Sequence, residues 1–326
     1  MTRLRRVLLV LVATSALGSA AAVLWLLRDP EPVFAARRGV LTLVEEQAVT
    51  AAAATAATTV TAAQDVRLTS SSGLTVEVGI RRPAGAERPD EIVRRPLFLV
   101  LGGHERGKAA GDLLTDTHGN VFAFLEYPFD GDHRASGLAA VAQVPAIRRA
   151  FYDIPPAVHL ALDYLLQRPD VDPTRVELVG ASFGTPFAII AAARDGRVTR
   201  LWLAHGGGDP YALIARGLER DIGFAPARAT VAALATLLIS GPRFAPERWI
   251  AQVSPRPVVM LNAEDDEKIP RRSVELLWEA ARAPKELVWL PGLHMQGNRP
   301  DVLERLLAEV LTRPAPPAGA TAPAPR

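Results

Sequence analysis

The stretch RVELVGASFGTPFAIIAAA, residues 175–193, decides the fold of this chain. It opens at 175–179 with an apolar, β-prone segment, and it closes at 185–193 with an apolar run that has a proline in its first turn, which is typical of a helix. Between them, residues 180–184 place Ser182 between two glycines. Glycines permit a turn too sharp for neighbouring side chains, and such a turn exposes the serine oxygen at the N-terminus of the helix. The stretch therefore predicts a strand, a tight turn and a helix.

The residues before this stretch extend the pattern. Residues 154–167 have the apolar spacing of a helix, and residues 169–173 supply a turn rich in proline and aspartate. This order of elements resembles the α/β-hydrolase fold, in the branch of serine esterases and dienelactone-hydrolase-like enzymes. The resemblance covers residues 65–312. It implies a mostly parallel, eight-stranded-type sheet flanked by helices, with a small helical cap inserted after the sixth strand.

A serine hydroxyl is a poor nucleophile and needs a base, which a third group orients. In the family, the acid follows the penultimate strand, four residues before a proline that opens the next helix. Here residues 257–262 predict that strand, and the register selects Asp266, because Pro270 follows four residues later. Asp265 is an adjacent alternative. Asp209 is another, because some hydrolases place the acid after an earlier strand.

The base follows from the order of motifs along the chain. Residues 286–290 predict the last strand, and His294 lies in the loop after it. Of the six histidines, only His294 follows both the nucleophile and the acid, as the family requires. The resemblance therefore implies Ser182 as nucleophile, Asp266 as acid and His294 as base.

An oxyanion hole needs backbone N–H groups aimed at the developing negative charge, each worth about 3 kcal/mol. The resemblance implies the amide of Phe183, the residue after the nucleophile, as one donor. The other comes from the loop after the strand predicted at 96–101, where the sequence has Gly-Gly-His in place of the usual His-Gly-x. The alignment selects the amide of His104, with Gly103 as the fallback.

Three nearby residues are candidates for the substrate pocket. Arg106 and Lys108 follow the oxyanion loop, and Tyr127 begins the loop after the strand predicted at 122–125. The two cations either favour an anionic group on the substrate or belong to a solvated basic loop. Carboxylic esters are the substrate class that the resemblance favours. An amidase or peptidase with the same triad is an alternative, as is a non-catalytic hydrolase-fold binding module at a membrane.

A long connection follows the strand predicted at 201–204. About 50 residues separate it from the next strand, where about 20 would suffice. In the family, insertions at this point form a cap, which we expect at about 207–254. Residues 229–239 are helix-prone and apolar, so this part of the cap could line a pocket for an acyl chain, touch a membrane or pack on the core.

The N-terminus has the features of a targeting segment. Three arginines precede residues 7–27, an uncharged and mostly apolar run, and about 20 such residues cross a bilayer core of roughly 30 Å. We expect a membrane anchor over 1–30, with the arginines on the cytoplasmic side and the catalytic domain outside the cytoplasm. The alternative is a signal peptide cleaved near residues 19–22, which would release a secreted protein.

The remaining segments complete the expected organisation. Residues 31–64, rich in alanine and threonine, are expected to be a spacer, and a surface helix is the alternative for 37–64. The alternation of residues 65–80 around a Ser-Ser-Gly turn predicts a β-hairpin at the antiparallel start of the sheet. The catalytic domain is expected over 65–312, and residues 313–326, rich in proline and alanine, are expected to be disordered.

Composition narrows the function classes. The 37 lysines and arginines are interleaved with 35 acidic residues, for a net charge of +2. The sequence lacks the basic stripe with aromatic residues that would indicate nucleic-acid binding. The absence of cysteine excludes disulfides and cysteine-ligated metals. No metal-spaced cluster and no phosphate-binding loop is present in the sequence, so neither a metal nor a cofactor is expected. The expected partners are a small-molecule ester and a membrane, and the oligomeric state stays open.

Overall fold

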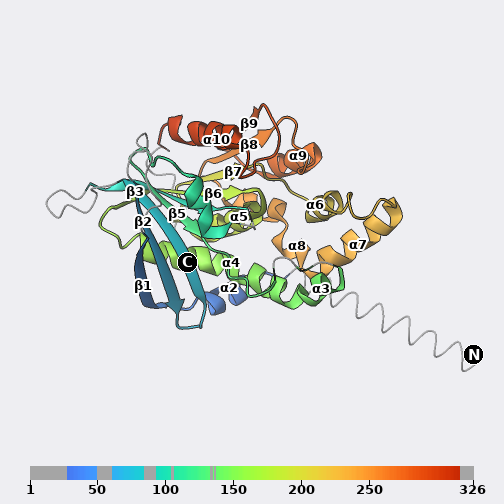
Figure 1. Cartoon of the computed structure of the whole chain (residues 1–326), viewed down its shortest axis with the longest axis horizontal. Helices are drawn as coiled ribbons and strands as arrows, with labels where there is room; N and C mark the ends of the chain where they lie inside the picture. The colour runs from blue at the N-terminus through green and yellow to red at the C-terminus, as the bar shows by residue number, and fades with distance from the viewer. Residues whose placement is uncertain are drawn as a thin grey trace, which may run out of the picture.

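Nine strands form one sheet in the order β1-β2-β3-β5-β4-β6-β7-β8-β9. The structure is a computed structural model that describes residues 28–49, 61–83, 93–103, 106–132, 135 and 137–315. The strands from β4 onward run parallel to one another, and β1, β2 and β3 form an antiparallel end of the sheet (Figure 1). The strands are β1 Leu41–Val49, β2 Thr61–Ser70, β3 Thr75–Pro83, β4 Arg95–Leu101, β5 Val121–Leu125, β6 Val171–Ala181, β7 Arg200–Ala204, β8 Val258–Ala263 and β9 Lys285–Leu290.

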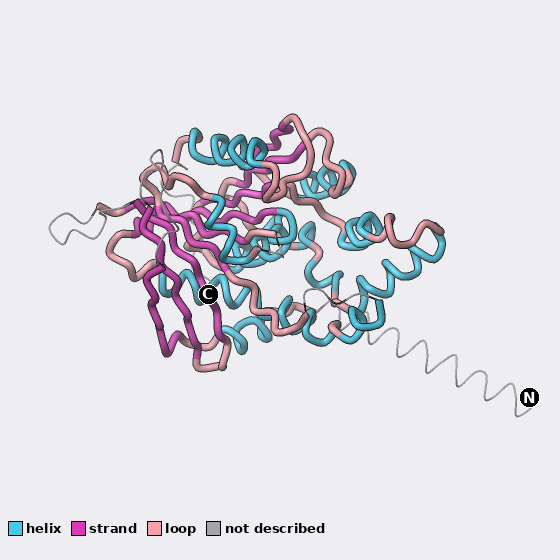
Figure 2. Tube along the Cα trace, viewed as in Figure 1, coloured by secondary structure: helices cyan, strands magenta, loops and turns pink. Residues whose placement is uncertain are grey.

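Helices cover both faces of the sheet, with α10 on one face and α4 on the other (Figures 1 and 2). Strands β5, β7 and β8 are buried at every position, as expected for parallel strands with helices on both sides. The α-helices are α2 Glu31–Arg38, α3 Gly137–Ala142, α4 Val144–Leu165, α5 Thr185–Arg194, α6 Pro210–Gly217, α7 Ala225–Leu238, α8 Gly241–Phe244, α9 Arg271–Ala280 and α10 Pro300–Thr312. The 3-10 helices are η1 Gly107–Leu113, η2 Ser182–Gly184, η3 Pro246–Arg248 and η4 Ile250–Gln252.

The antiparallel end of the sheet agrees only in part with the sequence expectations. The hairpin expected around the Ser-Ser-Gly turn is confirmed, because β2 and β3 pair in antiparallel register on either side of it. The spacer expected over 31–64 is wrong for its described part. Helix α2 contributes Phe34, which is 1% exposed, and β1 pairs with β2 along its length. The folded domain therefore begins upstream of residue 65, because residues 31–49 contact distant parts of the chain.

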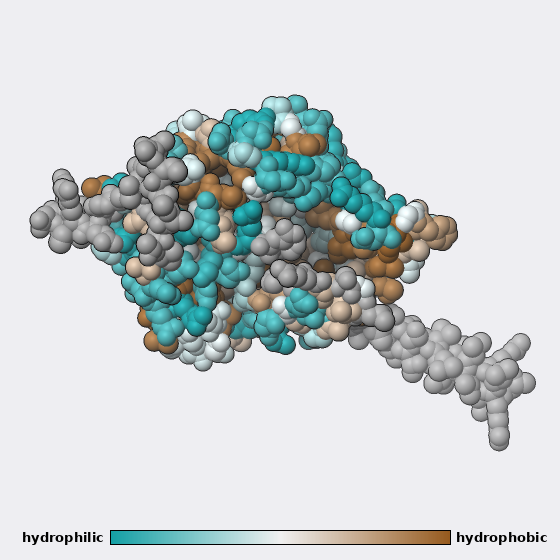
Figure 3. All heavy atoms as spheres, in the orientation of Figure 1, coloured by the Kyte–Doolittle hydropathy of each residue, from teal (hydrophilic) through white to brown (hydrophobic). Residues whose placement is uncertain are grey.

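The insertion between β7 and β8 carries helices α6, α7 and α8, which matches the expected cap. Helix α7 buries only Ala232 and Thr236, so its large apolar side chains do not pack on the core. Its exposed large apolar residues form what we call the α7 apolar face, and Figure 3 shows apolar side chains gathered at this end of the molecule. The α7 apolar face consists of Val231, Leu234, Leu237 and Leu238.

The two terminal segments fall largely outside the described residues. The expected anchor lies there as far as residue 27, and so does the expected disordered tail from residue 316. Across the part of the chain that the structure describes, no helix is both long and apolar enough to cross a membrane.

Candidate active site

The serine turn joins β6 to α5. Ser182 has a backbone φ of 52°, a left-handed conformation that is strained for a residue with a side chain. A Cβ on Gly184 would lie 2.2 Å from the backbone oxygen of Leu101 in β4, and a Cβ on Gly180 would lie 2.7 Å from the Cβ of Ala188. Both glycines are therefore required by close backbone approach, and the turn places Ser182 at the carboxyl end of the central strands, where ligands bind in open α/β sheets.

The structure brings Ser182, His294 and Asp266 together from the ends of three strands. The Oγ of Ser182 is 2.9 Å from Nε2 of His294. On the other side of the ring, Nδ1 of His294 is 2.8 Å and 3.1 Å from the two carboxylate oxygens of Asp266. A carboxylate only accepts, so Nδ1 carries the proton and Nε2 is free to accept from the serine hydroxyl. This arrangement can move a proton from the serine to the imidazole.

Asp266 is the carboxylate that the structure places on His294. Its Oδ1 also accepts hydrogen bonds from the backbone N–H groups of Lys268 and Ile269, each at 2.8 Å, which hold it in the loop after β8. The two alternative acids lie elsewhere. Asp265 is exposed, and the Asp209 side chain accepts from the backbone N–H of Ala212 at the start of α6.

Glu267 supports the histidine loop, and sequence reasoning did not find it. Its carboxylate accepts from the backbone N–H of His294 at 2.8 Å and from Arg299 at 2.7 Å. Burial alone would raise its pKa, but these hydrogen bonds and the charge of Arg299 lower the pKa of Glu267 to about 2. The residue next to the proposed acid therefore stays ionised and holds the backbone of His294.

His205, the residue after β7, is a second histidine beside the site. It is 1% exposed, and its Nδ1 accepts from the backbone N–H of Met295 at 2.9 Å. Burial, and then the charge of His294, lower the pKa of His205 to about 4, so that the ring is neutral at pH 7 with its proton on Nε2. The sequence placed His205 after a strand but showed no role for it, because its contact with Met295 spans 90 residues.

The oxyanion loop is described only in part, because His104 lies outside the described residues. Gly103 is described, and a Cβ there would meet nothing within 4 Å, so this side of the loop is open. The Tyr127 hydroxyl donates to the backbone oxygen of Gly102, and burial raises the pKa of Tyr127 well above its usual value. The Tyr127 ring also packs against Phe183, with ring centroids 5.3 Å apart at 87°. Tyr127 thus connects the two backbone segments expected to supply the oxyanion donors.

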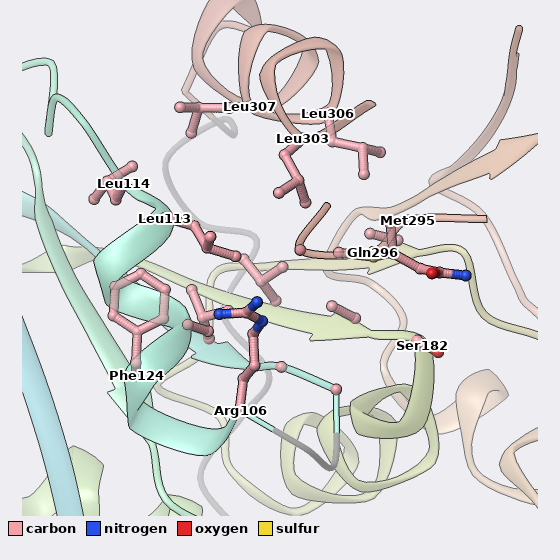
Figure 4. Close-up of a pocket in the computed structure, with 18 of the residues that line it drawn as sticks. Arg106, Leu113, Leu114, Phe124, Ser182, Met295, Gln296, Leu303, Leu306 and Leu307 are labelled. Atoms are coloured by element: carbon pink, nitrogen blue, oxygen red, sulfur yellow. The ribbon is translucent and has the colours of Figure 1, made fainter. Parts of the chain in front are cut away.

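Of the two remaining pocket candidates, only Arg106 lines the cavity beside Ser182. Arg106 lines the cavity that contains Ser182 and His294 (Figure 4). Lys108 does not, because its Nζ is 2.7 Å from the carboxylates of both Asp65 and Glu77 on strands β2 and β3. Lys108 is therefore a neutralising partner for two acids rather than a pocket residue.

One cluster among the described residues has the composition of a metal site. Ligand atoms of His205, Asp266 and His294 all lie within 4.8 Å of one another. Each is already engaged: His205 accepts from a backbone N–H, and His294 bonds Asp266 and Ser182. These hydrogen bonds suit proton transfer, and a metal ion would have to replace them.

No protein-family model matches the sequence. The chain is 30% identical over 137 residues to "Uncharacterized protein YfhR" of Salmonella typhi, and equally to the protein of that name from Salmonella typhimurium. The match spans 40% of this chain and 44% of each relative, so it covers less than half of either protein.

Solved structures resemble the chain over more of its length. Acetyl xylan esterase from Paenibacillus sp. R4 has a TM-score of 0.57 at 15% identity, over 84% of this chain and 90% of the esterase. The alpha/beta hydrolase GrgF from Penicillium sp. sh18 has a TM-score of 0.53 at 20% identity, over 76% and 96%. The 2,6-dihydroxy-pseudo-oxynicotine hydrolase has a TM-score of 0.54 at 20% identity, over 81% and 72%. At such identities, the likeness shows a shared fold.

Proposed function

The chain has the α/β-hydrolase fold, and on that basis we propose that it is a serine hydrolase that cleaves carboxylic esters through an acyl-enzyme intermediate. The observation that carries the proposal is the continuous contact from Ser182 Oγ through the His294 ring to the Asp266 carboxylate. The structural neighbours point the same way, because they include an acetyl xylan esterase and a hydrolase. The relatedness is at the level of fold, so the reaction is argued from the site.

The first half of the reaction is acyl transfer to the enzyme. His294 Nε2 takes the proton of the Ser182 hydroxyl while Oγ attacks the ester carbonyl, and the carbonyl oxygen becomes an oxyanion. The backbone N–H groups of Phe183 and of Gly103 or His104 stabilise that charge. Protonated His294 then donates its proton to the leaving alkoxide, so an alcohol departs and the acyl group stays on Ser182.

The second half returns the enzyme to its starting state. A water molecule gives a proton to His294 Nε2 and attacks the acyl carbonyl, and the resulting intermediate expels the Ser182 oxygen, which recovers its proton from His294. Asp266 keeps the imidazole in the tautomer with the proton on Nδ1 and stabilises its cationic form. Glu267 holds the backbone of His294 throughout.

A fluorophosphonate probe and ester kinetics test the proposal. The full chain should be labelled and Ser182→Ala should not, and Ser182→Ala should lose activity by about 10⁴-fold or more. Asp266→Asn should lower kcat by about 10³- to 10⁴-fold, because the tautomer preference is lost. Asp265→Asn, one residue away and exposed, is the matched control and should retain activity.

Two experimental outcomes would favour a different function. Faster turnover of an amide than of the ester with the same acyl group would assign the same triad to an amidase or peptidase. A folded chain that resists the probe and turns over neither substrate would indicate a non-catalytic binding module.

We also propose that the domain is anchored to a membrane and lies outside the cytoplasm. Residues 7–27 supply an apolar run of the required length, and helix α2 begins shortly after it, at Glu31. Asp29 pairs with Arg194, and Phe34 packs on Phe244 of α8, the helix that follows α7. The chain therefore enters the domain on the side of α7, whose apolar face would rest on the same bilayer. Release of the full chain from membranes by alkaline carbonate would contradict the anchor. Recovery of a soluble chain that begins near residue 20 would favour cleavage and secretion.

A further inference from the structure

An apolar cavity of about 550 Å³ lies between α10, η1 and the sheet, with Ser182 and His294 in its wall. Its volume falls within the range of small-molecule sites, roughly 300 to 1,000 Å³. None of the described residues of the insertion between β7 and β8 lines it. The expected cap, which could have lined a pocket for an acyl chain, therefore does not form this cavity.

Between β4 and β5, the described residues form the 3-10 helix η1, whose Gly111 lies so close to Phe124 that a Cβ there would lie 2.9 Å from the ring. Helix α10 packs over the neighbouring strands, and the space between the two helices stays open. An apolar pocket of this size with a few polar groups in its wall is typical of a small-molecule site.

Most of the cavity wall is apolar. Side chains of the sheet and α10, among them Val179, Trp202 and Leu307, make most of the wall apolar. Figure 4 shows Ser182 at one end, with Leu114 and Phe124 at the other end and the leucines of α10 along one side.

Besides Ser182, the polar wall residues lie in the loops that follow β4, β8 and β9, with Lys268 in the loop after β8. The Arg106 guanidinium packs against Gly297, where an added Cβ would lie 2.2 Å from its Nη2, and Gln296 and Asn298 flank that contact. The cavity therefore has polar loop residues in its wall near the serine and apolar side chains along the sheet and α10.

We propose that this cavity binds the acyl chain of the ester substrate, so that the substrate class is esters of extended aliphatic acids rather than acetate. The proposal rests on the proposed function, because it places the scissile carbonyl at Ser182 and the acyl chain of the substrate along the sheet beneath α10. An acetyl group would leave the cavity unfilled. Each methylene buried there contributes about 0.8 kcal/mol, which corresponds to about a fourfold rise in kcat/KM.

The first test is a chain-length series with the full chain, using p-nitrophenyl acetate, butyrate, hexanoate, octanoate and dodecanoate. We expect kcat/KM to rise about fourfold for each buried methylene and to fall once the chain exceeds the cavity. A flat or falling series from acetate to octanoate, in protein that hydrolyses acetate, would overturn the proposal.

A substitution that fills part of the cavity tests where the acyl chain of the substrate lies. Leu307→Trp at the end far from Ser182 should lower kcat/KM for octanoate at least tenfold more than it lowers kcat/KM for acetate. Ala308→Trp is the matched control, because Ala308 is the next residue of α10 and is exposed. Equal losses for acetate and octanoate in folded Leu307→Trp would contradict the placement.

A binding measurement separates this proposal from the proposed function. Titration calorimetry of the Ser182→Ala chain with decanoate and acetate should detect binding of decanoate alone, and Leu307→Trp in the same background should weaken it. Absence of decanoate binding to the Ser182→Ala chain would overturn the cavity assignment. This result does not depend on whether the Leu307→Trp variant folds. Binding of decanoate by a chain whose wild type resists fluorophosphonate would support the cavity and overturn the hydrolase.

Discussion

At Gly184 a backbone oxygen sets the space available to any side chain. The Leu101 carbonyl of β4 stands 2.2 Å from the position of an added Cβ, and neither backbone can withdraw without moving a central strand. This contact explains the second glycine of the serine turn, and Gly180 is constrained in the same way by Ala188. The strained φ of Ser182 is thus held by its neighbours on both sides.

Gly184→Ala should therefore destabilise the protein by about 3 kcal/mol or more, at the upper end of the cost of overpacking. Thermal unfolding followed by circular dichroism measures the loss. Gly217→Ala is the control, because a Cβ at Gly217 meets nothing within 4 Å, and it should change stability little. Equal melting temperatures for the two variants would contradict the steric account.

Glu267→Gln should reduce stability in a pH-dependent way. The pKa of Glu267 is lowered from 4.5 to about 2 in the folded protein, so its contribution is present above pH 4.5 and is lost as the pH falls toward 2. The variant should be less stable than wild type at pH 7, and the difference should shrink below pH 4.5. Denaturant unfolding across this pH range tests this, with exposed Glu264→Gln as control. A difference that does not depend on pH would contradict the assignment.

At the scale of elements, prediction from sequence succeeded where burial is continuous. The strands at β4, β5 and β8 consist of apolar runs, and a run buried on both faces is recognisable without its neighbours. Helix α4 shows the opposite case. It begins at Val144, upstream of the start expected at 154, and continues through Pro155 and Pro156. Burial of its surface against the sheet offsets the hydrogen bonds that the prolines remove.

The α7 apolar face gives a prediction at this scale. The chain has no cysteine, so Leu234→Cys provides a unique attachment site for a bimane label in the full chain reconstituted into lipid vesicles. Because we propose that α7 rests on the bilayer, lipids carrying a quencher should reduce the fluorescence of this label strongly. Leu43→Cys is the control, because Leu43 is 50% exposed on β1, far along the sheet from the insertion. Equal quenching at the two positions would contradict contact through α7.

At the level of the whole molecule, helix α2 belongs to the folded domain. Phe34 of α2 packs between Tyr152 of α4 and Phe244 of α8, with ring centroids 6.2 Å and 6.3 Å away. Arg38 on the same helix forms an ion pair with Asp163 of α4. Helix α2 therefore connects the sheet-covering helix to the insertion.

Phe34→Ala in the full chain should lower stability by about 3 to 5 kcal/mol, because it empties a buried aromatic site, and should lower the melting temperature by roughly 10 °C. Val33→Ala, one residue earlier and 38% exposed, should change it little. Differential scanning calorimetry of both variants decides the point. A stable Phe34→Ala protein would mean that the domain does begin near residue 65, as the composition of residues 31–64 suggested.

The order of the serine, acid and histidine motifs, the buried central strands and the glycine-bounded turn can be recognised in the sequence alone. These features depend on residues close together in the chain, where periodicity and turn geometry are visible. Three features required the folded structure: α2 and β1 join the domain, Glu267 and His205 hold the loop of His294, and a cavity opens beneath α10. Each of these depends on segments far apart in the chain, and the free energy of such contacts is set by packing that no local pattern records.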